Sequence, residues 1–86
     1  MLTVADIPLV DVTEVKTLPG YRIEVAFEDG KRGVFDMTPY LDKGVFRTLR
    51  NPSVFDAASL GLGTVRWPGD IDIAPERLYT DCEPIA

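Results

Sequence analysis

The chain has 86 residues, a net charge of −5 at neutral pH, no histidine and a single cysteine. This length fits one small domain with a thin core, and the apolar fraction of 45 % argues against disorder. Without histidine the commonest general base near neutral pH is missing, a structural zinc site has no ligand set, and the acidic charge disfavours nucleic acid.

We expect neither a signal peptide nor a membrane span in this chain. Residues 1–8 lack a basic start and an apolar block of signal-peptide length, and the apolar runs are far shorter than the roughly 20 residues of a membrane span. We therefore expect a cytoplasmic protein with no membrane association. It would be one domain over residues 1–86, with a loose arm at 1–8 and a tail at 81–86. Cys82 is expected to be an unreactive tail residue, because the neighbouring carboxylates raise a thiol pKa.

Three strands are predicted in the first half of the chain. Val10, Val12 and Val15 lie in a Thr- and Val-rich run whose apolar phase shifts, which indicates a bulge or a strand covered on both faces. Residues 21–28 alternate apolar and polar side chains, as a half-buried strand does. A third strand is predicted from about residue 31 to 37, after the Asp29-Gly30 turn.

The register of the second and third strands follows from the side chains that each loop length brings together. A two-residue loop would set Ile23 opposite Asp36. A three-residue loop over residues 28–30 sets Ile23 opposite Phe35 and Arg22 opposite Asp36, so that apolar faces apolar and opposite charges pair. We predict the three-residue loop, with Gly30 in the left-handed conformation.

The rest of the chain predicts short helices and further strands. Thr38-Pro39 and Asn51-Pro52 each combine a capping side chain with a proline, the pattern of a helix start. Residues 64–67 predict a fourth strand, residues 70–73 a brief one, and residues 75–79 a last helical turn. The expected fold is therefore α+β: a three-stranded antiparallel meander, a strand from the C-terminal part that returns to it, taken as residues 64–67, and short helices packed on one face.

Several motifs resemble one known family. They are Phe27 with Asp29-Gly30 and Asp36, Gly44-Val45-Phe46, Val65-Arg66-Trp67-Pro68, and the closing run from Asp70 to Tyr79. Over about residues 9–80 the chain resembles the bacterial domain of unknown function (DUF) family 2442, most specifically from Trp67 to Tyr79. The resemblance implies a compact α+β domain without a catalytic motif. Some members continue into a helix-turn-helix segment, which this chain lacks, and some are encoded beside small proteins suspected of being toxins.

Clustered carboxylates are the candidates for metal-dependent chemistry. Asp70, Asp72 and Glu76 lie close together in the sequence, and Asp36 is a fourth candidate from the third strand. Carboxylate oxygens suit hard cations such as Mg²⁺, so a divalent-metal-dependent hydrolase is one alternative function. Acidic residues near the first turn of a helix also cap free N–H groups and complement the helix dipole. We favour this structural role, and expect no metal, no cofactor and no catalytic residue.

A basic run and two aromatic residues are the candidates for partner binding. Lys43, Arg47 and Arg50 share one side of a helix if that helix passes unbroken through Gly44; otherwise they form a solvated face. Trp67 and Tyr79 are large aromatics of the kind that anchor interfaces, although core packing is the default for Trp67.

The predicted function is a non-catalytic protein-interaction domain. It would offer a strand edge or an apolar patch to a protein partner, such as a neighbouring small toxin in an antitoxin-like role, or to a second copy in a homodimer. A nucleic-acid accessory role for the basic run is a further alternative, although the net negative charge disfavours binding of nucleic acid by the chain itself.

Overall fold

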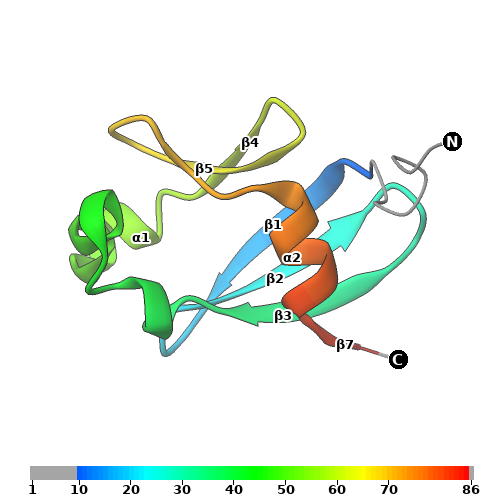
Figure 1. Cartoon of the computed structure of the whole chain (residues 1–86), viewed down its shortest axis with the longest axis horizontal. Helices are drawn as coiled ribbons and strands as arrows, with labels where there is room; N and C mark the ends of the chain where they lie inside the picture. The colour runs from blue at the N-terminus through cyan, green and yellow to red at the C-terminus, as the bar shows by residue number, and fades with distance from the viewer. Residues whose placement is uncertain (1–9, 86) are drawn as a thin grey trace, which may run out of the picture.

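The computed structural model describes residues 10–85, so the arm predicted at residues 1–8 lies outside the described residues. The elements follow in chain order: β1 (Val12–Leu18), β2 (Arg22–Phe27), β3 (Arg32–Asp36), the 3₁₀ helices η2 (Thr38–Tyr40) and η3 (Gly44–Arg50), α1 (Pro52–Phe55), β4 (Ser59–Gly61), β5 (Thr64–Trp67), β6 (Ile71–Asp72), α2 (Pro75–Asp81) and β7 (Glu83–Pro84) (Figure 1). None of the helices in this part of the chain is long and apolar enough to cross a membrane.

The strands form two antiparallel sheets. The first, sheet A, has the order β1-β2-β3-β7, and the second, sheet B, has the order β4-β5-β6. The α+β class, the meander and a returning C-terminal strand are thus confirmed. The strand that returns is β7, however, within the predicted tail, whereas residues 64–67 join sheet B. A hairpin between neighbouring segments closes a short loop, which costs less chain entropy than a return to the meander.

The predicted irregularities of the meander are confirmed. The register between β1 and β2 shifts between Val12 and Glu14, which is the bulge indicated by the apolar phase. Between β2 and β3, Ile23 faces Phe35 and Arg22 faces Asp36. The N–H of Phe27 donates to the carbonyl of Lys31 at 2.9 Å and closes the three-residue loop, in which Gly30 has a φ of +95°.

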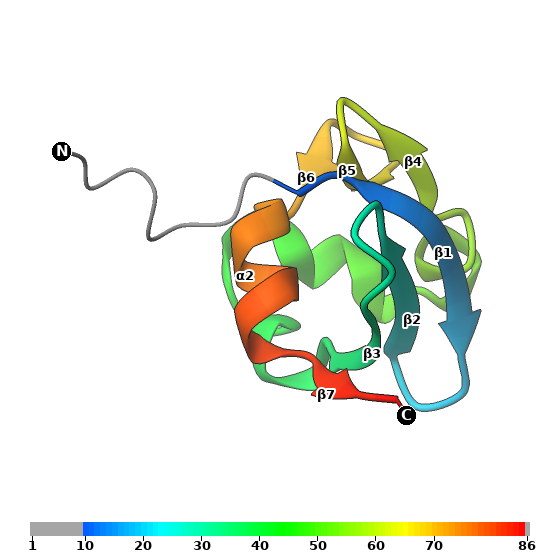
Figure 2. The ribbon, with the colours of Figure 1, turned by 90° about the vertical axis from the view of Figure 1, so that its right-hand side faces the viewer.

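The core lies between one face of sheet A and the helices. Figure 2 shows α2 beside the meander, and Leu49 of η3, Phe55 of α1 and Leu78 of α2 belong to one core cluster with the buried side chains of β2 and β3. The side chains that are most completely buried come from β2, η3, β5, α2 and the residue after β3: Ile23, Val25, Met37, Leu49, Val65 and Leu78. Leu78 is the buried residue of α2, so this one side chain anchors the helix that leads into β7.

The two predicted helix starts differ in how they are capped. Asn51 caps α1 as predicted, since its side chain accepts a hydrogen bond from the N–H of Ser53 at 3.0 Å. The hydroxyl cap predicted for Thr38 is wrong. Asp36 Oδ1 instead accepts from the N–H of Thr38 at 2.9 Å and from its hydroxyl at 2.7 Å. A carboxylate is the stronger acceptor, and these bonds hold the pKa of Asp36 below its ordinary value.

Candidate functional site

The four carboxylates predicted as metal ligands do not converge. Asp36 is engaged with Thr38, and Asp70 Oδ1 lies 3.7 Å from Arg66 Nη2. Asp72 ends β6, and Glu76 lies in the first turn of α2, where its charge complements the helix dipole. Within residues 10–85, no three His, Cys, Asp or Glu side chains are close enough to hold one metal ion. The geometry therefore gives these carboxylates no common centre for chemistry.

The basic run does not lie on one continuous helix. Gly44 has a φ of +47° and begins η3, while Lys43 before it has an extended backbone. Arg50 Nη2 pairs with Asp42 Oδ1 at 2.5 Å, which partly neutralises the run. Arg47 lies three residues before Arg50 and therefore on the same side of this 3₁₀ helix. The condition for a shared helix face is therefore not met, because η3 begins at Gly44 and Lys43 lies outside it.

The two aromatic candidates have different environments. Trp67 is only 3 % exposed and donates from Nε1 to the carbonyl of Phe55 at 3.0 Å, so it is a core residue. Tyr79 is half-buried, and its hydroxyl donates to Asp29 Oδ2 at 2.6 Å. Its ring packs edge-on against Phe27, with Lys31 Nζ 4.2 Å from the ring centroid. Tyr79 therefore ties α2 to the loop between β2 and β3.

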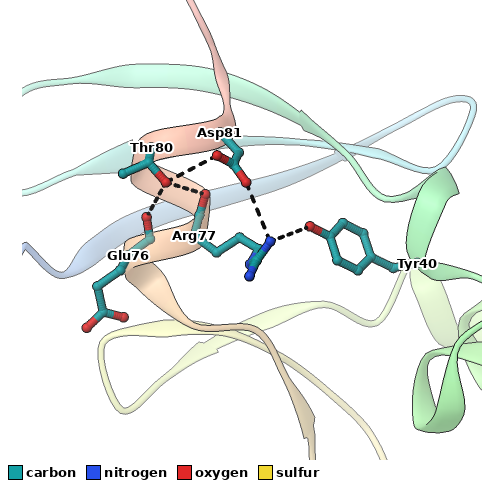
Figure 3. Close-up of polar contacts among 5 residues, drawn as sticks. All are labelled: Tyr40, Glu76, Arg77, Thr80 and Asp81. Atoms are coloured by element: carbon teal, nitrogen blue, oxygen red, sulfur yellow. Dashed lines mark hydrogen bonds and ion pairs between the residues drawn. The ribbon is translucent and has the colours of Figure 1, made fainter.

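The exposed face of α2 carries a small polar network (Figure 3). Arg77 Nη1 lies 3.4 Å from the hydroxyl of Tyr40 and 3.7 Å from Asp81 Oδ2, while the hydroxyl of Thr80 lies 3.0 Å from the carbonyl of Glu76. An open hollow of about 440 Å³ lies beside α2 and is lined by Glu76, Arg77, Thr80 and Asp81 together with Ala74. The Thr80 hydroxyl also lies 3.5 Å from the carbonyl oxygen of Arg77 and 3.2 Å from Asp81 Oδ1, so all of its partners belong to its own helix.

One edge of the meander is covered by the end of the chain. Gly33 and Val34 of β3 pair with Pro84 and Glu83, and the N–H of Ile85 donates to the carbonyl of Arg32 at 2.9 Å. A Cβ added to Gly33 would lie 2.9 Å from the carbonyl oxygen of Glu83 and closer still to the sulfur of Cys82. Only glycine at this position lets β7 approach so closely.

Cys82 is part of this covered edge. Its side chain belongs to the core cluster and the residue is 6 % exposed, so Cys82 is a core residue and not the tail residue that was expected. Burial is the main cause that raises the pKa of its thiol, and the charge of Asp81 adds only a smaller contribution. A buried thiol with a raised pKa is a poor nucleophile at neutral pH.

The other edge of the meander is β1, and its hydrogen-bonding pattern can be read from β2. The carbonyl of Tyr21 and the N–H of Phe27 bond toward β3, whereas the N–H of Glu28 bonds toward the β1 side, to the carbonyl of Asp11 at 3.0 Å. Residues of a central antiparallel strand bond alternately to its two neighbours. The residues of β2 that bond to β1 are therefore those at even positions, Arg22, Glu24 and Ala26.

The register between β1 and β2 shows which backbone groups of β1 face away from the sheet. The partners of the three even-numbered residues of β2 are Leu18, Lys16 and Glu14, whose backbone groups turn inward. Val15 and Thr17 therefore direct their N–H and C=O groups outward. Among residues 10–85, no strand pairs with this side of β1. We call the segment from Glu14 to Leu18 the free edge.

The free edge begins where the second sheet stops covering β1. The N–H of Val12 donates to the carbonyl of Gly63, in the β4–β5 turn, at 2.9 Å. Val15 and Thr17 face the core side of the sheet opposite buried residues of β2 and are half-buried, whereas Glu14 and Lys16 are exposed on the outer face. Figure 2 shows β1 at the margin of the meander, with the β4–β5 hairpin near its start.

The sequence anticipates an open strand edge but does not assign it to β1. Strand order depends on which segment returns to the meander, and β7 is only two residues long. The one available signal was the Thr- and Val-rich run with Glu14 and Lys16 at alternate positions, which is typical of a half-exposed strand.

Comparison with known proteins identifies a family without adding a function. No curated protein and no solved structure matches the chain. The family model of a protein of unknown function, DUF2442, matches residues 12–84. These residues run from the start of β1 to the end of β7, so both sheets and the covered edge lie within the match. The resemblance found in the sequence is confirmed, and the chain belongs to the DUF2442 family.

Proposed function

We propose that this domain is a non-catalytic protein-interaction module that binds a protein partner through the free edge of β1. The observation that carries the proposal is the pair of outward-facing backbone positions, Val15 and Thr17, on a seven-residue edge strand. Unpaired N–H and C=O groups of an edge strand form a template for a strand from another chain.

The side chains around the free edge suit such an added strand. Val15 and Thr17 are β-branched and half-buried, so a second strand would cover apolar surface on the core side. Glu14 and Lys16 would line the outer side and select partner strands by charge. Main-chain hydrogen bonds then supply affinity, and these alternating side chains supply specificity.

A proline at the centre of the free edge tests this function. In Val15→Pro the outward N–H is lost and the ring blocks an added strand, while the inward ladder bonds of Glu14 and Lys16 are kept. Val15→Ala is the matched control, since it loses the same valine packing and retains the N–H. We expect proteins captured by the wild-type chain and by Val15→Ala to be absent from captures with Val15→Pro, with circular dichroism showing that all three are folded.

Hydrogen exchange on a captured complex gives the second readout. The amides of Val15 and Thr17 should gain protection when the partner is bound, because both become hydrogen-bonded. Equal capture by Val15→Pro and the wild type, or protection that appears elsewhere and not at these two amides, would show that the free edge is not the contact.

A further inference from the structure

We infer that the strand accepted by the free edge is β1 of a second copy of this chain, paired antiparallel about a two-fold axis at Val15. The inference rests on the proposed function, because it names the occupant of the same edge. The two four-stranded sheets would then join into one continuous sheet through their β1 strands. The charges of β1 itself determine both the occupant and the register.

Only a few registers are compatible with the backbone. In a symmetric antiparallel pair, outward-facing residues must meet outward-facing residues to exchange hydrogen bonds. Val15 and Thr17 face outward, so the two-fold axis can pass through Val15, through Thr17, or midway at Glu14 or Lys16. These registers place different side chains opposite one another on the outer face.

The outer-face charges favour the register centred on Val15. There Glu14 lies opposite Lys16 of the second copy, and by symmetry Lys16 lies opposite Glu14 of that copy. An axis at Glu14 sets two glutamates against each other, and an axis at Lys16 sets two lysines against each other. Like charges directly opposite across strands destabilise the pair, whereas opposite charges stabilise it.

The remaining register and the inner face agree with this choice. An axis at Thr17 would bring Pro19 opposite Val15, and proline has no N–H for the ladder. With the axis at Val15, the two half-buried valines meet on the core side, opposite the buried Val25 of each chain. Apolar contact, ladder bonds and complementary charges then fall at the same place, and β1 is complementary to itself.

Charge exchange at two positions tests the inference. Glu14→Lys and Lys16→Glu each convert both symmetry-related attractive pairs into repulsive ones, so each should weaken dimerisation about tenfold. The double variant restores complementarity between the copies, but it also loses the intrachain pair of Glu14 with Arg32 (3.5 Å) and sets a carboxylate opposite Glu24. Its dissociation constant should therefore be clearly lower than those of both single variants without fully reaching the wild-type value. An equimolar mixture of the two single variants should form a heterodimer, because one carries two lysines and the other two glutamates at these positions.

Sedimentation velocity from about 1 µM to about 1 mM protein measures these equilibria. About 0.15 M salt, where the Debye length is about 8 Å, screens the repulsion between two chains of net charge −5. Circular dichroism checks that every variant is folded. In the wild type, protection of the Val15 and Thr17 amides should also rise with protein concentration, which needs no substitution.

The outcomes separate the inference from the function on which it rests. A wild-type chain that stays monomeric at about 1 mM, or single variants that dimerise as well as the wild type, would overturn the second copy as occupant. If Val15→Pro still abolishes capture of another protein in that case, the proposed function stands and its partner is a different chain. If neither self-association nor capture depends on the free edge, both the inference and the proposed function are wrong.

Discussion

The two edges of sheet A are opposites in construction. On the β3 side, the chain returns to pair β7 with Gly33 and Val34, and this strand has only two residues, one of which is a proline. On the β1 side, Val15 and Thr17 present backbone groups that no described strand takes up. Natural sheets blunt their edges with short strands and prolines. A chain that does this at one edge and leaves the other regular for five residues is what the proposed function requires, with one edge for stability and one for contact.

The covered edge is held by close packing of side chains. The free edge is characterised instead by the alternation of charged and β-branched side chains along β1. Gly33 allows Cys82 and Glu83 to lie against β3, and Leu78 and Tyr79 position the helix that delivers them. At the free edge, by contrast, alternation along β1 sets the charges of Glu14 and Lys16 on one face and the β-branched side chains on the other. Substitutions should therefore affect stability at the first edge and association at the second.

The largest expected effect comes from Leu78→Ala, which removes the buried anchor of α2. A buried leucine truncated to alanine loses its transfer free energy and leaves a cavity, together about 2–5 kcal/mol. Urea denaturation followed by circular dichroism measures this loss, with Glu76→Ala on the exposed side of α2 as the control, expected within about 0.5 kcal/mol of the wild type. Similar midpoints for the two variants would mean that α2 does not hold the covered edge in place.

Gly33→Ala should destabilise the chain by about 1–3 kcal/mol, the usual range for an overpacked core. The new methyl group would meet Cys82 and the carbonyl of Glu83, neither of which can retreat without moving β7. Gly61→Ala is a matched strand glycine, whose Cβ would lie 2.7 Å from Cδ of Arg66, part of a flexible side chain.

The difference between these two glycine variants is the informative quantity. Gly33→Ala should show the lower urea midpoint, and exchange of the Ile85 amide, which bonds to β3, should speed up in that variant alone. Equal midpoints would indicate that β7 separates from β3 without loss of stability, and the contrast between the two edges would then disappear.

Lowering the pH should cause the smallest of these changes in the stability of the fold. The hydroxyl of Tyr79 is the main cause that lowers the pKa of Asp29 below its ordinary value of 3.8, followed by the N–H of Lys31. A carboxyl with a lowered pKa in the folded state stabilises the fold above its unfolded pKa, and this contribution is lost as the pH falls through the folded pKa. The stability of the wild type should therefore decline as the pH falls below about 4.

Tyr79→Phe isolates this contribution. It keeps the ring against Phe27 and removes the hydroxyl, so the decline in melting temperature between about pH 5 and about pH 2 should become shallower than in the wild type. Thermal melts at matched ionic strength measure the two slopes. Parallel slopes would mean that the bond between Tyr79 and Asp29 does not couple the hairpin loop to α2.

Much of the meander could be predicted from the sequence, because its side chains allow few alternatives. The alternation from residue 21 to 28 and the match of Ile23 with Phe35 determined the hairpin, its three-residue loop and the conformation of Gly30. The phase shift between Val12 and Val15 likewise indicated the bulge. These features are local, and local patterns in the sequence are sufficient to specify them.

The strand order and the interaction surface could not be predicted in the same way. Residues 64–67 look alike whether they pair with the meander or with β4, and a two-residue strand such as β7 leaves no periodic pattern. The free edge is defined only once that order is known. The basic residues between 43 and 50 were predicted as partner-binding candidates instead, because a sequence shows charged side chains directly and does not show which backbone groups are unpaired.

The burial of Cys82 makes its thiol a probe of local opening at the C-terminal strand. Since its sulfur is enclosed between Gly33 and the start of β7, a thiol-specific reagent can react only in molecules whose last strand has swung away. The labelling rate therefore counts the openings of the C-terminal strand, and because this is the chain's only cysteine, no second site contributes to the signal.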